Sequence, residues 1–163
     1  MPFVIEWEMK IYIPTIFSFL ISVFLYATII LGQFGNYYMK YWWWDVMLHS
    51  GSGLAFGLMG LVTLLVFFKG GKIVAKPAVL CLFAFCFALA IGLTWEMFEF
   101  TGDGLFDTNM QQRQTGVVDT MKDEVMDALG AALAATLGYF YLRNNAPTPL
   151  EKILDKTVRK NRK

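Results

Sequence analysis

The sequence predicts an all-α membrane protein, a four-transmembrane-helix bundle with both termini cytoplasmic and a short basic amphipathic C-terminal helix. Three observations support this prediction. Hydrophobic residues make up 56% of the 163 positions and charged residues only 17%, whereas a soluble domain carries about 25% charged residues. Four apolar stretches each reach the roughly 20 residues that a helix needs to cross a bilayer. The basic residues are also segregated along the chain, which indicates an orientation.

The four expected spans cover residues 11–32, 44–68, 78–100 and 119–142. The first is uncharged, and Pro14 lies near its start, where proline is tolerated in a helix. Cys81 and Cys86 fall in the third span, on different sides of a helix, so we interpret them as packing residues rather than as a disulfide. We therefore assign residues 1–143 to the transmembrane domain and residues 144–163 to a cytoplasmic tail.

The tail has the pattern of a helix start. Thr148, Pro149 and Glu151 form a capping box with proline at the first helical position. Apolar residues then recur at helical spacing among basic ones, which is typical of a helix lying on an anionic membrane surface. A solvated tail helix fits the pattern equally well.

The basic residues predict the topology. Eleven of the 14 fall on the side that holds both termini, and only Lys40, Arg113 and Lys122 fall on the other. Because basic residues stay cytoplasmic, we expect a multi-pass protein of the inner (plasma) membrane with both termini inside. An aromatic segment then lies at the outer interface as a belt or, alternatively, as a lid or substrate platform: Tyr37, Tyr38, Tyr41, Trp42, Trp43 and Trp44.

Acidic residues gather on the outer side: seven of the 13 carboxylates lie at the outer ends of the last three spans, and Asp103 and Asp107 lie in the outer loop between the third and fourth spans. Carboxylates at membrane depth are costly and normally mark a site or a pathway. Their spacings of three and four place them on one helix face. Each such face continues into small residues, which let membrane helices approach closely. We therefore expect three helices to bring their acids into one interior pocket. The small-residue positions are Gly53, Gly57, Gly92, Ala88, Ala84, Gly130, Ala131, Ala134 and Gly138.

Crowded carboxylates repel one another, and a bound cation or proton relieves the repulsion. One imidazole among many carboxylates suits Mg²⁺, Mn²⁺ or Ca²⁺ better than zinc or iron. His49 is expected to act as a general base or as a further ligand. Glu124 is interpreted as a solvated acid at a helix N-terminus. A purely structural polar network is the alternative to the site. The expected metal ligands are Asp45, His49, Glu96, Glu99, Asp119, Asp123 and Asp127.

Three motifs resemble the YjdF-like family of small uncharacterised bacterial multi-pass inner-membrane proteins. They are the aromatic run before Asp45 and His49, the segment Trp95-Glu96-Met97-Phe98-Glu99, and the run from Gln114 through Asp119, Asp123 and Asp127 to Ala131. The resemblance spans about residues 41–131. It implies a small multi-pass membrane protein and identifies no substrate.

Three functions fit these residues. The first is a metal-dependent enzyme acting on a lipid or amphiphile from the outer leaflet. The second is a small transporter or ion or proton pathway using the same carboxylates. The third is a non-catalytic assembly subunit, with a homo-oligomer or membrane partner held through the small-residue faces. Membrane lipid is the expected partner, and no basic nucleic-acid face is present.

Overall fold

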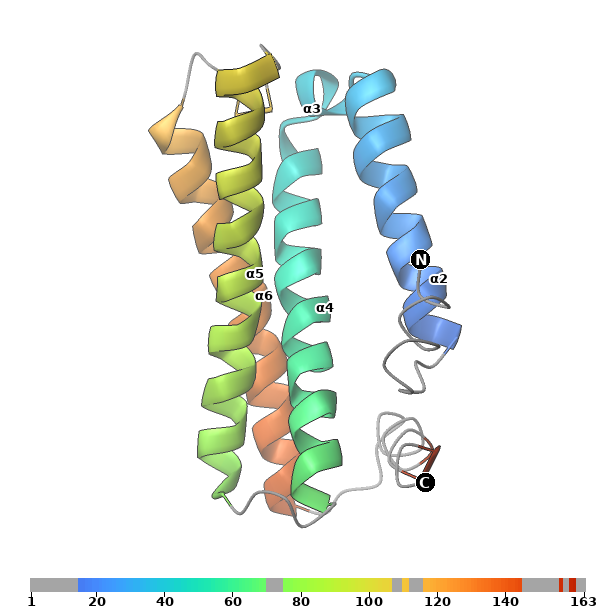
Figure 1. Ribbon diagram of the computed structural model, residues 1–163, viewed down its shortest axis with the longest axis vertical. Helices are drawn as coiled ribbons and strands as arrows, with labels where there is room; N and C mark the ends of the chain where they lie inside the picture. Colours follow the sequence, from blue (N-terminus) through green and yellow to red (C-terminus); the bar gives the residue numbers. More distant parts are fainter. Residues whose placement is uncertain are drawn as a thin grey trace.

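The computed structural model describes residues 15–69, 75–106, 110–111, 116–144, 156 and 159–160, and its regular elements are all helices (Figure 1). The first helix begins as an α-helix and continues directly into a π-helical stretch, and a single turn then leads into three long helices that lie side by side. The elements are α2 (Thr15–Leu25), η1 (Tyr26–Phe34), α3 (Tyr37–Lys40), α4 (Trp42–Lys69), α5 (Pro77–Phe106) and α6 (Val117–Asn144).

Three of the predicted spans are confirmed as helices long and apolar enough to cross a membrane: Trp42–Leu65, Pro77–Phe106 and Val117–Arg143. The first predicted span corresponds to a shorter apolar helix, Ser18–Phe34, within the described residues. The predicted tail lies outside the described residues apart from 156 and 159–160, which are helical.

Glycines let α4 and α6 come into backbone contact. A Cβ added at Gly53 would meet the backbone oxygen of Asp127, and one added at Gly130 would meet the backbone oxygen of Ser50. Farther along, a Cβ on Gly57 would lie 2.6 Å from the Cβ of Ala134. Real Cβ atoms do not approach so closely, so a side chain here would push the helices apart. The small residues expected between helices are buried there, as predicted.

The other long helix, α5, completes the bundle through the predicted stripe of Ala84, Ala88, Gly92 and Glu96, all of which are buried. An apolar core fills the end of the bundle farthest from α3, around Leu61, Leu65 and Leu80 (Figure 1). Cys81 is buried in that core, as expected of a packing residue, whereas Cys86 is exposed, so the interpretation of Cys86 as a packing residue within this bundle is wrong; both are free thiols.

The opposite end of the bundle, which we call the α3 end, holds α3, the start of α4, the end of α5 and the start of α6 (Figure 1). Asn36, with φ of 55°, lets the chain turn into α3. Between α5 and α6, the carboxylate of Asp103 accepts hydrogen bonds from the backbone N–H groups of Met110 (2.8 Å) and Gln111 (3.1 Å). Asp103 therefore stabilises the connection between these helices at the α3 end.

Candidate functional site

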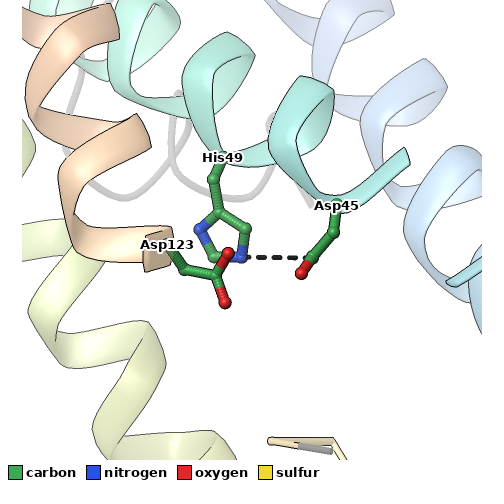
Figure 2. A group of neighbouring side chains, drawn as sticks. All are labelled: Asp45, His49 and Asp123. Atoms are coloured by element: carbon green, nitrogen blue, oxygen red, sulfur yellow. Dashed lines mark ion pairs between the residues drawn. The ribbon is translucent and has the colours of Figure 1, made fainter. Parts of the chain in front are cut away.

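Two carboxylate side chains and one imidazole converge at the α3 end of the bundle. Asp45 and His49 lie one turn apart on α4, and Asp123 approaches them from α6 (Figure 2). Each offers one ligand atom, and these atoms lie within 4.8 Å of one another. All three residues are buried. We call these residues the Asp–His–Asp group.

Asp127 lies one turn deeper on α6 and contacts the imidazole from the other side. Its Oδ2 is 3.1 Å from Nδ1 of His49, and its Oδ1 accepts a 2.7 Å hydrogen bond from the hydroxyl of Ser52. The opposite ring nitrogen, Nε2, lies 3.6 Å from Oδ1 of Asp45, too far for a hydrogen bond (Figure 2). The imidazole ring thus forms a hydrogen bond to Asp127 through Nδ1, and its Nε2 faces Asp45 and Asp123.

Glu96 brings a further carboxylate from α5. Glu96 is only 3% exposed, and neither of its carboxylate oxygens has a hydrogen-bond partner among the described residues. The Oδ1 atom of Asp123 is likewise buried without a hydrogen-bond partner there. Burying an ionised carboxylate is costly unless it is paired. These oxygens therefore need a proton or a cation.

Among the described residues, the basic side chain of Lys122 lies beside Asp45 and Asp123. Its Nζ lies 3.7 Å from Oδ2 of Asp45 and 4.0 Å from Oδ1 of Asp123. The lysine side chain is 38% exposed, so solvent weakens its interaction with both carboxylates. A single solvated ammonium does not neutralise the buried acids around it.

The remaining predicted site residues surround this group. Asp119 is buried in the first turn of α6, and Glu99 is half-buried on α5. Neither joins the Asp–His–Asp group. The interpretation of Glu124 as a solvated acid at the helix N-terminus is wrong. Because α6 already begins at Val117, Glu124 lies two turns into the helix, half-buried, with a buried Oε1 that lacks a hydrogen-bond partner in the described chain.

The aromatic segment divides into an exposed part and a packed part. Trp42 is largely exposed, as expected at an interface, whereas Trp44 is buried and stacks edge-on against Tyr37 with centroids 4.9 Å apart. Tyr38 is half-buried beside the acids. Burial raises the pKa of its phenol above the ordinary 10.0, and the negative charges of Asp45, Glu99 and Asp123 raise it further.

Sequence reasoning missed Ser52 and Lys122. Ser52 lies three residues after His49, on the same helix face, and that spacing could have indicated it. Its partner Asp127 lies 75 residues away, however, so only the packing of α4 on α6 reveals the hydrogen bond. Lys122 precedes Asp123 directly, and its proximity to Asp45 likewise depends on helix packing.

Comparison with known proteins identifies the family to which the chain is similar. Residues 1–144 match the family described as "Predicted membrane protein (DUF2238)". A protein of Thermotoga maritima named "Uncharacterized protein" is 33% identical over 124 residues, covering 72% of this chain and 58% of the relative. The chain thus spans little more than half of that relative's length. No solved structure matches. The family agrees with the expected membrane protein and is compatible with the YjdF-like resemblance.

Proposed function

The chain belongs to the predicted membrane protein family DUF2238, and we propose that it binds a divalent cation through Asp45, His49 and Asp123. The observation that carries the proposal is the convergence of three buried ligand atoms within 4.8 Å, contributed by two different helices. The neighbouring Glu96 strengthens it, because its two buried oxygens have no hydrogen-bond partner among the described residues.

The ligand geometry suits a cation that prefers oxygen. Ca²⁺ binds oxygen at about 2.3–2.6 Å, so two of its ligands can lie up to about 5 Å apart. Mg²⁺ and Mn²⁺ have shorter bonds and would require small rotations of the two aspartates. One imidazole and several carboxylates favour these three ions over zinc or iron.

The proposed membrane topology follows from the charges. With the first helix as a fourth span, both termini lie on the side that holds eleven of the 14 basic residues. That side is proposed to be the cytoplasm, so the α3 end and its acids would face the extracytoplasmic side of the inner membrane.

A metal-dependent enzyme acting on a lipid or amphiphile fits this arrangement best. A divalent cation there would polarise a phosphoryl or carbonyl oxygen of a substrate at the membrane surface. His49, held by Asp127, can accept a proton at Nε2 when it is not a ligand. Expected ligands outside the group, namely Glu96, Glu99 and Asp119, would bind the cation through water or complete its coordination.

A transport pathway receives less support from the packing. Beyond Asp127, the helix contacts toward the other end include Gly57, Ala134, Leu61 and Leu65, all buried. No charged side chain continues the acidic site through this part of the described bundle. A conduit needs polar groups farther across the membrane.

The cation is tested by thermal unfolding of the purified protein in nanodiscs. Chelation should lower the melting temperature, and Mn²⁺, Mg²⁺ or Ca²⁺ should restore it by mass action. Asp123→Asn should abolish most of this response. Thr94→Val should preserve it, because Thr94 is exposed and its hydroxyl donates a hydrogen bond to the backbone oxygen of Ala90 in its own helix. A wild-type melting temperature that neither chelator nor any of the three ions moves would refute the proposal.

A further inference from the structure

We infer that Asp127 and Ser52 are positioning residues that fix the tautomer and orientation of His49, so that Nε2 is presented to Asp45 and Asp123. The inference rests on the proposed cation site and deepens it. It assigns Asp127 a role different from the ligand role that its spacing suggests.

The hydrogen-bond distances distinguish the two ring nitrogens. Nδ1 lies 3.1 Å from Oδ2 of Asp127, within hydrogen-bond range, whereas Nε2 lies 3.6 Å from Oδ1 of Asp45, outside it. An ionised carboxylate can only accept a hydrogen bond, so the proton of the neutral ring belongs on Nδ1. The lone pair is then on Nε2, which faces Asp45 and Asp123.

Asp127 is itself held in place at several points. Its Oδ1 accepts the hydroxyl of Ser52 at 2.7 Å, its carboxylate packs on Gly92, and its backbone packs on Gly53. Each carboxylate oxygen thus has a hydrogen-bond partner on α4, and the side chain is 3% exposed. Turning either oxygen of Asp127 toward a cation would therefore break one of these two hydrogen bonds.

This arrangement has a physical purpose at a metal site. A histidine that ligates a metal usually donates its other N–H to a carboxylate, which fixes the tautomer and makes the ligating nitrogen more basic. Loss of such a carboxylate typically lowers metal affinity by roughly 10- to 100-fold. The serine in turn restricts the carboxylate, so its removal should have a smaller effect in the same direction.

Nitrogen NMR tests the inference directly, because the chain contains one histidine. We would label histidine with ¹⁵N in a protein purified without a polyhistidine tag and record the two ring nitrogens at a pH where the ring is neutral. Wild type should show the proton on Nδ1. Asp127→Ala should lose this preference, and Ser52→Ala should weaken it, whereas Thr94→Val should leave it intact. A proton on Nε2 in the wild type, or an unchanged tautomer in both the Asp127 and the Ser52 variants, would overturn the inference.

Titration with Mn²⁺ alone separates this inference from the proposed function. We expect Asp127→Ala to lower Mn²⁺ affinity by roughly 10- to 100-fold, and Ser52→Ala to lower it less. Ser52→Ala removes only one hydroxyl and provides the test if Asp127→Ala does not fold. If wild type shows the Nδ1–H tautomer but binds no Mn²⁺, the cation proposal fails and the positioning role stands. If Mn²⁺ binds and both variants bind it as wild type does, the positioning role fails.

Discussion

Gly92→Ala should damage the site without changing any polar group. A Cβ at this position of α5 would lie 2.7 Å from Oδ2 and 3.2 Å from Cγ of Asp127. An ordinary contact needs at least about 3.4 Å, so the carboxylate must retreat by roughly 0.7 Å. Oδ2 is the atom that lies 3.1 Å from His49 Nδ1. The new methyl group and His49 Nδ1 would then both contact Oδ2, and a displacement of that size would disturb the geometry of the hydrogen bond.

The expected magnitude follows from that lost contact. A hydrogen bond to a charged group contributes about 1.5–3 kcal/mol, and overpacking a core costs about 1–3 kcal/mol. Replacing a helical glycine by alanine recovers about 1 kcal/mol, so we expect a net loss of about 1.5–5 kcal/mol in unfolding free energy. Mn²⁺ affinity should fall by roughly 10- to 100-fold, as it does when a histidine loses its carboxylate partner.

Gly51→Ala is the matched control, because a Cβ there would meet nothing within 4 Å although the position lies only two residues from His49. It should raise the melting temperature slightly through helix propensity and leave Mn²⁺ binding unchanged. Calorimetric titration with Mn²⁺ and thermal unfolding in nanodiscs provide both readouts. If Gly92→Ala binds Mn²⁺ as tightly as Gly51→Ala does, the close packing of α5 on Asp127 does not support the site, and the reasoning is refuted.

Three further results are expected. Glu96→Gln should stabilise the metal-free protein and weaken its response to Mn²⁺, because it removes an unpaired buried charge. In a hydrogen-bonded structural network the same change would destabilise the protein. Thermal unfolding with and without chelator distinguishes the two cases. The pKa of the Tyr38 phenol is raised above its ordinary value of 10.0, and its contribution to folding is fully present below pH 10.0. This contribution is lost as the pH rises above that value, because only the unfolded chain then ionises. Tyr38→Phe should therefore make the alkaline fall in melting temperature shallower, and a fall identical to that of the wild type would contradict the assignment. In a background without native cysteines, Met110→Cys should label from outside intact cells and Lys156→Cys should not; the reverse pattern would place the acids in the cytoplasm.

The sequence was informative about helices and about which of their faces are buried. Hydropathy located α4, α5 and α6 because a bilayer requires long apolar helices. The small residues that continue each acidic stripe predicted the helix contacts, and Gly53, Gly92 and Gly130 lie in those contacts. Both kinds of signal depend on periodicity within one helix, which a single sequence displays directly.

The roles of individual acids could not be predicted in the same way. Spacing alone placed Asp123 and Asp127 on one face as equivalent candidates. Their difference arises from the depth at which α4 crosses α6, since Asp127 meets His49 Nδ1 and Ser52 while Asp123 lies with Asp45 on the other side of the ring. Glu124 was misread although the expected start of the last span, residue 119, lies only two residues after the observed start at Val117. The spacing of residues within one helix does not show how far packing against neighbouring helices buries a side chain, and Glu124 is half-buried.

Electron spin-echo spectroscopy of bound Mn²⁺ tests the central claim most directly. The spectrum detects nitrogen bonded to the manganese, and the chain can supply imidazole nitrogen only from His49, its one histidine. In protein purified without a polyhistidine tag, the proposed site predicts nitrogen coupling that changes on ¹⁵N labelling of histidine and disappears in His49→Gln. Bound Mn²⁺ without nitrogen coupling, or no bound Mn²⁺ at all, would contradict a cation held by Asp45, His49 and Asp123.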